Sequence, residues 1–458
     1  MKLPRGLKNN LDNRGNILLV ATMFGLLAFS FTVAAISNYA LSENRASVYK
    51  HNRERAFQIS EAGTNYYRWH LAHNNTDYKD GTSSTGPYYH DFEDKDGNVI
   101  GRYALTVTQP PTGTTVVTID SQGWLLSQEN SKRNIKIQVG FPSLTDYSFL
   151  TNSQIWIGNT ESTHGKFQSN DGVHFDGVCD APVMSAVPTF YCDSSIGCSG
   201  KQNGVFGSGG PSQFFIYPMP SKDFSAVTAK LSTIKTNAGI SLSSSGAYGW
   251  YLKFLSSGKI YISKVTGVTK CLSGGGWGGW GGWGASDCWD ITSTSSGATH
   301  DMPTSTYIYV ADNTWVDGVV KGRVTVGAAS DTKNPSIVVN GNLTYAAKDG
   351  TNAIGLIAED DIIVPYYSPD NLEIDAAMLA QYGKVYRPEY SNTKKTITIY
   401  GSILTYDQWT WSYVNSSNVV ISGYITTTNM YDGNLTYSPP PGFPVGSEYS
   451  PISWEETD

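Results

Sequence analysis

The feature that most constrains this chain is an uncharged, mostly apolar run of 20 residues from Ile17 to Ile36. As an α-helix, a run of this length spans about 30 Å, which matches the hydrocarbon core of a bilayer. A secretory signal has a shorter apolar segment, of about 7–15 residues, that ends at a small-residue cleavage site. Here no Gly or Pro interrupts the chain between Ile36 and Ala62, so the helical pattern continues. We therefore predict one helix over residues 16–72, with its first part in the membrane.

The second part of this predicted helix is amphipathic. Its apolar residues recur at steps of three and four, which places them on one helix face. These residues are Ala56, Ile59, Ala62, Tyr66 and Trp69. We expect a sheet to bury this stripe, because a helix with one apolar face needs a second layer to cover it.

The rest of the chain has the composition of a turn-rich β protein of the cell surface. It holds 47 Gly and 29 Tyr among 458 residues, and only 16% of its residues are charged. Basic residues do not orient the span, because four precede it and four follow it up to Arg55. We place the N-terminus inside the cell and the ectodomain outside, because only the C-terminal part looks exported. The net charge of −7 and the lack of a long basic tract argue against nucleic acid as a partner.

Two motifs flank the apolar run. A short basic leader ends in Arg14-Gly15 just before the run, and the segment AFQISEAG occupies residues 56–63 after it. With these motifs, residues 1–75 resemble the N-terminal region of type IV prepilins, specifically minor pilins of the PilX kind. The resemblance implies that a prepilin peptidase cleaves between Gly15 and Asn16. It also implies that the apolar helix packs with other pilins in a filament built by the pilus assembly machinery.

Two positions depart from the family pattern. Most prepilins carry Glu at the fifth mature position, where this chain has Val20, and the first mature residue is usually Phe or Met, where it has Asn16. Minor subunits without that Glu are often linked to a tip or initiating position, so the resemblance points to the pilus tip. The alternative is an uncleaved signal anchor on a surface adhesin or envelope protein that never enters a filament.

The residues after the helix divide into four further segments. Residues 76–142 contain three alternating strand patterns, in 102–109, 114–123 and 134–141, and are expected to form a small antiparallel sheet like a pilin head. Residues 143–305 are expected to be an irregular β region with Cys/Gly-rich insertions and one helix over 221–239. Residues 306–430 carry short strands in a rough repeat. Residues 431–458 are a Pro-rich C-terminal tail, in which the segment SPPPGFP from Ser438 cannot join a ladder and is expected to wrap the outside.

The repeat decides the expected fold class. Apolar β-branched runs recur about every 15–23 residues, as the coils of a β-solenoid do. The prediction is therefore a mainly β protein with a long N-terminal α-helix, a small antiparallel sheet and a right-handed β-solenoid. A β-sandwich is the alternative, because its strands also come at short intervals.

Five cysteines and a tryptophan-rich loop complete the candidate features. If the protein is exported, local disulfides are expected for Cys192 with Cys198 and for Cys271 with Cys288, which leaves Cys179 single. The alternative is five reduced thiols. The segment between the second pair carries Trp277, Trp280 and Trp283 among glycines. These rings either fold inward over the solenoid wall or form an exposed patch that contacts a surface such as a glycan, or the repeat is only low-complexity drift.

No enzyme, cofactor or metal site is predicted. Glu359 and Asp361 are separated by one residue, like a carboxylate pair on one face of a strand, but a capped turn explains them better. His164, His174 and Asp176 lack the spacing of a metal site. The predicted function is that of a minor pilin acting in pilus assembly and surface contact. The alternatives are the membrane-anchored adhesin and a surface enzyme acting on polysaccharide.

Overall fold

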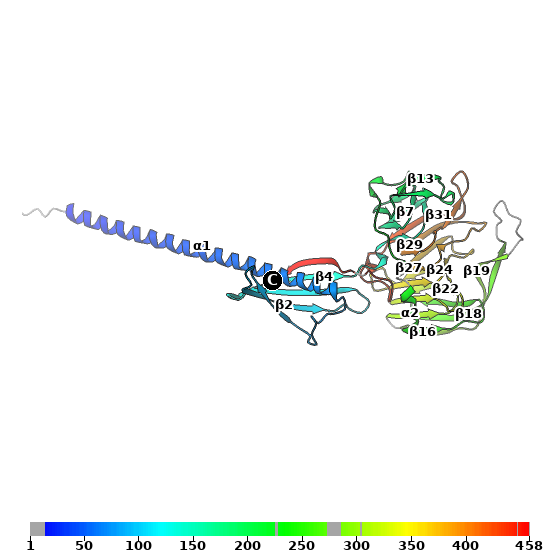
Figure 1. The fold of residues 1–458 in the computed structure, drawn as a ribbon, viewed down its shortest axis with the longest axis horizontal. Helices are drawn as coiled ribbons and strands as arrows, with labels where there is room; N and C mark the ends of the chain where they lie inside the picture. Colours follow the sequence, from blue (N-terminus) through cyan, green and yellow to red (C-terminus); the bar gives the residue numbers. More distant parts are fainter. Residues whose placement is uncertain (1–13, 225–227, 273–284, 303–304, 447, 458) are drawn as a thin grey trace, which may run out of the picture. The chain divides into compact units, whose positions relative to one another are not determined.

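A computed structural model describes residues 14–224, 228–272, 285–302, 305–446 and 448–457. The chain is mainly β with one long N-terminal helix, as predicted, and it divides into two compact units. Unit 1 comprises Met1–Thr108, Thr118–Gln138 and Pro451–Asp458, and unit 2 comprises Gln109–Val117 and Val139–Ser450. Figure 1 shows both units as ribbons.

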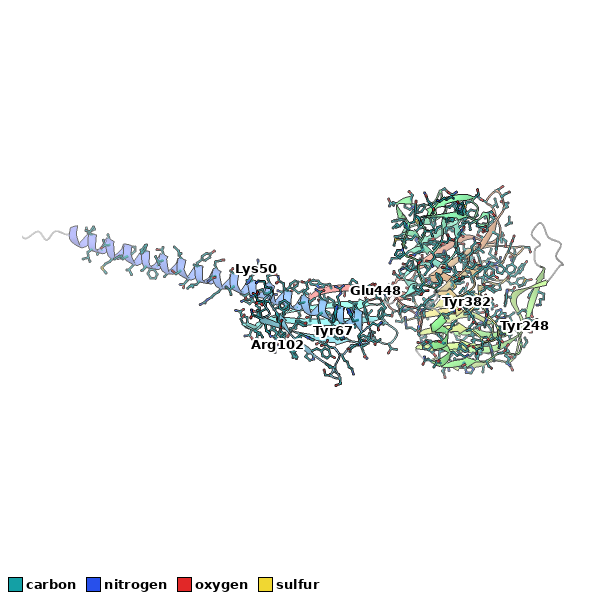
Figure 2. The ribbon with its side chains drawn as sticks, viewed as in Figure 1. Lys50, Tyr67, Arg102, Tyr248, Tyr382 and Glu448 are labelled. Atoms are coloured by element: carbon teal, nitrogen blue, oxygen red, sulfur yellow. A yellow bond between two sulfur atoms is a disulfide. The ribbon has the colours of Figure 1, made fainter. Side chains whose placement is uncertain are left out.

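Helix α1 runs without interruption from Arg14 to His73. Its apolar first half, including Ile17–Ile36, is exposed to the surroundings, and Figure 2 shows no element of unit 1 packed against it. The helix is long and apolar enough to cross a membrane, with a mean hydropathy of 2.3 over its most apolar window. The predicted span is therefore an exposed helical rod, which requires lipid or other apolar helices around it.

The second half of α1 packs on a five-stranded sheet in unit 1. The sheet order is β1-β2-β3-β4-β32, and the pairs β1–β2 and β2–β3 are antiparallel. The strands are β1 (Tyr88–Glu93), β2 (Val99–Thr108), β3 (Val116–Leu125), β4 (Gln128–Gly140) and β32 (Ser450–Thr457). Strands β2, β3 and β4 cover the three patterns read from the sequence.

The last strand, β32, corrects the expected tail. The prolines of residues 439–444 lie outside strands, as expected, but the chain then forms β32 beside β4. Lys136 of β4 lies 3.4 Å from Glu455 of β32, and Arg133 pairs with Glu456. Trp454 meets Phe57 of α1 edge to face at 6.0 Å between ring centroids. The sequence did not predict this strand pairing, because more than 300 residues separate β32 from β4.

The larger segment of unit 2, Val139–Ser450, is therefore inserted in the sequence between the last two strands of the unit 1 sheet. Within unit 2 the outgoing and returning segments run side by side. The rings of Phe141 and Tyr449 stack at 3.9 Å, and the Ser143 hydroxyl donates to the Pro444 carbonyl at 2.8 Å. Gly446 donates its N–H to the carbonyl of Pro142 at 2.7 Å. The first residues of the insertion are thus paired with its last residues.

Unit 2 consists largely of parallel strands stacked in three ladders, in which most strands pair with one that follows a coil of chain later. The exceptions are β29 and β31, which pair with β5 and β7 from an earlier part of the chain. Ladder A joins β16 (Ile240–Leu242), β21 (Ser305–Val310), β23 (Arg323–Ala328), β25 (Ala353–Ala358), the ends of β27 (Asn371–Ala380) and β29 (Thr393–Thr405), β5 (Phe149–Thr151), β8 (Phe167–Ser169), β11 (Val183–Ser185) and β15 (Phe215–Ile216). Ladder B joins β17 (Gly249–Leu255), β22 (Thr314–Val320), β24 (Ile337–Tyr345), β26 (Ile362–Ile363) and β28 (Val385–Tyr386). Ladder C joins the starts of β27 and β29, β31 (Val420–Tyr431), β7 (Glu161–His164) and β10 (Val178–Cys179).

Smaller elements attach to these ladders. A parallel trio comprises β6 (Ile155–Ile157), β9 (Val173–Phe175) and β14 (Val205–Phe206). Antiparallel additions are β12 (Thr189–Cys192), β13 (Gly200–Asn203), β18 (Lys259–Leu272), β19 (Ala285–Thr294), β20 (Ala298–Asp301) and β30 (Ser412–Val414). The buried aliphatic side chains of the ladders form one continuous core.

The outer side of ladder A is covered. Helix α2 (Thr228–Thr236) lies there and is shorter than the predicted 221–239. Leu231 and Ile234 of this helix, with Phe224, join a second core with Ala353 and Ile357 of β25. The Pro-rich segment contributes Leu435 and Phe443 to the same core. The tail therefore packs on the outer side of ladder A before it forms β32.

Candidate functional site

The site singled out by the sequence is the second half of α1, which packs on the unit 1 sheet through small residues. Ala56, Ser60 and Gly63 recur at steps of four and three, and all three are buried. The Ser60 hydroxyl donates to the carbonyl of Ser121 in β3 at 2.7 Å. The AFQISEAG segment is thus the part of α1 whose small side chains let the sheet backbone approach the helix. We call this contact the seam.

Three glycines line the seam. A Cβ atom at Gly123 of β3 would lie 2.5 Å from the Ala56 carbonyl oxygen and 2.8 Å from the Ser60 Cα. A Cβ atom at Gly63 would lie 2.8 Å from the ring of Tyr103, and one at Gly101 would lie 2.7 Å from the Trp124 carbonyl oxygen. No side chain fits at such distances, so the seam requires glycine on both layers.

The predicted apolar stripe is wrong at its C-terminal end. Trp69 is 58% exposed, and Ala62 and Tyr66 are only half-buried. The buried face instead continues from Gly63 to Tyr67 and Leu71. The apolar periodicity did not predict this face, because the periodicity follows the large apolar residues. The face that meets the sheet includes small and polar residues instead.

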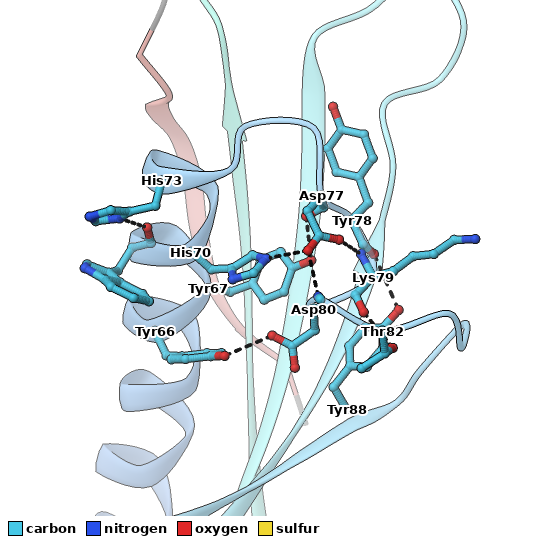
Figure 3. A network of polar contacts seen from close by, with 12 residues as sticks. Tyr66, Tyr67, His70, His73, Asp77, Tyr78, Lys79, Asp80, Thr82 and Tyr88 are labelled. Carbon is cyan, nitrogen blue, oxygen red and sulfur yellow. Dashed lines mark hydrogen bonds and ion pairs between the residues drawn. The ribbon is translucent and has the colours of Figure 1, made fainter.

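Beyond the seam, a polar network holds the loop after α1 against the helix (Figure 3). His70 Nε2 lies 3.0 Å from Asp77 Oδ2, and the Tyr67 hydroxyl donates to the Asp77 carbonyl at 3.0 Å. The Tyr66 hydroxyl donates to Asp80 Oδ1 at 3.1 Å, and His90 Nε2 lies 2.7 Å from Asp80 Oδ2. Two aspartates therefore tie the loop to the last two turns of α1 and to β1.

The electrostatics of this network follow from its geometry. Backbone N–H donors, first that of Lys79 and then that of Gly81, hold the pKa of Asp77 below its ordinary value. Burial, together with the neighbouring Asp80 carboxylate, raises the pKa of Tyr66 to about 12. Asp77 is therefore an anion and Tyr66 a neutral donor across the physiological range, which keeps the loop attached.

The residues predicted for leader processing lie at the start of α1. Gly15 and Asn16 belong to the helix, and their side chains lie outside the described part of the structure. Val20 is described and is 64% exposed. The structure places these residues but leaves cleavage as a prediction.

The cysteines divide into one described pair and three others. The structure joins Cys192 and Cys198 in a disulfide, with their Cα atoms 5.8 Å apart. Cys179 is a buried free thiol. Cys288 is buried and disulfide-bonded, whereas the side chain of Cys271 lies outside the described residues. Trp277, Trp280 and Trp283 also lie outside the described residues, so their role as a contact patch stays a prediction.

Three acidic residues of unit 2 accept hydrogen bonds from neighbouring turns. The Glu359 carboxylate accepts the N–H of Ser330 at 2.9 Å, and that of Asp361 accepts the N–H of Lys384 at 2.7 Å. Asp312 is fully buried and bonded to Ser245 and Lys333. These carboxylates satisfy donors at the turns between strands, which is the interpretation that the sequence favoured.

The three residues considered as a metal site do not meet at one point. His164 pairs with Asp180, and His174 pairs with Asp176. His164 Nδ1 lies 2.7 Å from Asp180, whereas His174 Nε2 lies 3.1 Å from Asp176 and its Nδ1 lies 2.8 Å from the Ile196 carbonyl. Both ring nitrogens of His174 therefore already face oxygen atoms. Within the described residues no cluster of three or more His, Cys, Asp or Glu has metal-site geometry.

Comparisons with known proteins add little. No protein-family model matches the chain, and no curated protein sequence matches it. A solved structure that resembles it is the crystal structure of the competence-associated pilin ComZ from Thermus thermophilus. The two chains are 13% identical, with a TM-score of 0.30 over 89% of this chain and 98% of that one. A likeness this weak leaves the function to be argued from the residues of this chain.

Proposed function

We propose that this protein is a minor type IV pilin of the PilX kind that acts in pilus assembly and in contact with surfaces. One observation carries the proposal. Helix α1 is a single helix with an exposed apolar first half, and its second half lies on a sheet through the AFQISEAG segment. A membrane anchor alone needs only the first half. The seam makes the rod and the sheet one rigid body, which suits a subunit that packs by its helix and carries an ectodomain.

The architecture of unit 2 belongs to the same proposal. We propose that ladders A, B and C are three faces of a right-handed β-solenoid. Parallel pairing between successive coils supports this over a β-sandwich of antiparallel strands. A solenoid is a stiff, elongated support, and it suits a module that presents a surface to the environment. We propose no catalytic role for it, since the carboxylates that a polysaccharide enzyme would use are bonded to backbone donors.

The second candidate is a membrane-anchored surface adhesin that stays outside any filament. Asn16 and Val20 favour it, because they stand where most prepilins carry Phe or Met and Glu. The two candidates share the membrane helix and the surface role, and they differ in whether residues 1–15 are removed.

Leader cleavage separates the two candidates. In a host with a prepilin peptidase, the wild-type chain is expected to lose residues 1–15, and Gly15→Leu is expected to keep them because a bulky residue obstructs the cut site. Gly25→Leu is the matched control, since Gly25 lies within the span and nothing lies within 4 Å of a Cβ built there. Intact-mass spectrometry reads the outcome. If wild type and Gly15→Leu both retain residues 1–15, so that their masses differ only by the substitution itself, the anchored adhesin is left.

A further inference from the structure

The outward side of ladder C carries a regular array of hydroxyl groups. The register pairs Thr396 of β29 with Thr426 of β31, and Thr398 with Thr428. Strand β7 continues the second row, because Ser162 pairs with Thr428. Since alternate side chains of a strand point to opposite sides, the residues between them point inward. Ile397, Thr427 and Glu161 occupy those inward positions and are buried.

The spacing of this hydroxyl array follows from strand geometry. Neighbouring strands lie about 4.8 Å apart, and every second residue along a strand lies about 6.6 Å further on. Parallel pairing without a bulge over Thr396–Gly401 keeps the rows straight. The array is therefore a two-dimensional lattice of hydroxyl groups on a rigid backbone, in which the four threonines have restricted side-chain rotamers because they are β-branched.

Much of the hydrogen-bonding capacity of the array is unused within the protein. Thr396 donates to Asn371 at 3.0 Å, and Ser162 makes only long contacts of 3.4 and 3.5 Å to its neighbours on β31. The side-chain hydroxyl groups of Thr398 and Thr426 have no hydrogen-bond partner among the described residues. Thr426 is exposed, and Thr398 and Thr428 are half-buried. These hydroxyls are thus available to an external partner.

The surroundings of the array define the chemistry of that partner. The four threonines carry no charge, and the flanking Glu373 and His164 are paired with Lys348 and Asp180. The exposed Lys395 beside Thr396 is a single cation, whereas an anionic polymer would require clustered Lys or Arg. The next row on this side pairs Met430 of β31, which is 42% exposed, with the half-buried Tyr400 of β29. The face therefore offers hydroxyl groups in rows beside apolar side chains, and a sugar ring presents the complementary hydroxyl edges and C–H faces.

From this arrangement we propose that the outward side of ladder C binds a linear, uncharged polysaccharide. The partner's repeated hydroxyl groups would pair with the rows formed by Thr396, Thr398, Thr426 and Thr428. This inference rests on the surface-contact part of the proposed function and is independent of leader cleavage. It also does not depend on the contact patch predicted for Trp277, Trp280 and Trp283.

Adsorption of the full-length protein in detergent to insoluble chitin and to microcrystalline cellulose tests the proposal. The quadruple variant Thr396→Val, Thr398→Val, Thr426→Val and Thr428→Val removes the hydroxyls and keeps the β-branched shape. Losing several hydrogen bonds at once is expected to weaken adsorption by about 10- to 100-fold. The matched control is Thr292→Val, Thr294→Val and Thr299→Val, at exposed positions of β19 and β20. Its adsorption is expected to equal that of the wild type.

A second variant distinguishes loss of the hydroxyl contacts from loss of the fold. Replacing the same four threonines by serine keeps every hydroxyl and is expected to retain adsorption, whereas a merely structural role would weaken the serine and valine variants alike. Adsorption to neither polysaccharide would overturn the proposal. So would unchanged adsorption of the valine variant, which would assign contact to the tryptophan loop or another surface. Partition of the wild type into growing ice or onto heparin, without binding to chitin or cellulose, would also overturn it.

Discussion

Gly123 of β3 lies directly on the backbone of Ser60 in α1. A Cβ atom at Gly123 would approach the Ser60 Cα to 2.8 Å, while the Ser60 hydroxyl donates to the carbonyl of Ser121 two residues earlier in the same strand. Helix and sheet thus meet backbone to backbone. This contact makes α1 a part of the sheet domain and not a flexible tether.

The first prediction tests this contact. Gly123→Ala is expected to destabilise unit 1 by about 2–3 kcal/mol, because the added methyl group meets fixed backbone atoms and must push the helix away. Urea unfolding followed by near-UV circular dichroism measures the change. Gly25→Ala is the control, since a Cβ atom there has open space around it. If Gly123→Ala and Gly25→Ala have equal free energies of unfolding, the close backbone contact at the seam is contradicted.

Glu161 yields a prediction about pH. This residue of β7 is buried, its carboxylate accepts the Gly158 N–H at 2.9 Å, and burial raises its pKa from the ordinary 4.5 to about 8. An acid with a raised pKa holds its proton more tightly in the folded state. The stability of unit 2 is therefore expected to fall as the pH rises from about 4.5 to about 8, and to change little through this group above pH 8.

Glu161→Gln removes this dependence, because its neutral amide still offers an oxygen to Gly158. The variant is expected to melt several degrees higher than the wild type at pH 9 and to match it near pH 4. Thermal melts across this range read the difference. Asp331→Asn is a suitable control, because this side chain is exposed and forms only a surface ion pair with Lys235. Parallel pH profiles for wild type and Glu161→Gln would refute the assignment.

A third prediction concerns the C-terminal strand. Removing residues 451–458 deletes most of β32 and leaves the edge of β4 unpaired. Amide hydrogen exchange of β4 is expected to rise by at least about tenfold, while exchange in ladders A, B and C stays unchanged because they belong to unit 2. The milder variant Trp454→Ala removes the contact with Phe57 and keeps the strand. It is expected to have an intermediate effect, and unchanged β4 exchange after the deletion would rule out a structural role for β32.

The fourth prediction addresses the position of the subunit in a filament. Val20 lacks the carboxylate that would neutralise the N-terminal amine of a neighbour, and an unpaired buried charge is costly. We therefore expect few copies, at the filament tip or start. Immunogold labelling is expected to mark filament ends in the wild type and to spread along the shaft with Val20→Glu. The uncharged variant Val20→Gln is the control, and label along the whole shaft of wild-type filaments would contradict the expectation.

The sequence by itself determined the features that depend on neighbouring residues. Ile17–Ile36 and the absence of Gly or Pro up to Ala62 predicted the long helix, which runs to His73. Alternation over residues 101–141 predicted β2, β3 and β4. Both patterns are local, because helix and strand periodicity are set within a few residues. The short spacing of Cys192 and Cys198 likewise predicted a local disulfide.

Only the tertiary structure decided which residues meet across long sequence separations. The local sequence of residues 450–457 does not predict that they pair with β4, which lies more than 300 positions earlier in the chain. Trp69 looked like the end of the buried stripe, whereas Gly63, Tyr67 and Leu71 form it. Glycines at 101 and 123 inside strand patterns were the available signal for a close approach, but they do not say what approaches. Local chemistry fixes the conformation of a segment, and packing against distant segments then decides which of its faces is buried.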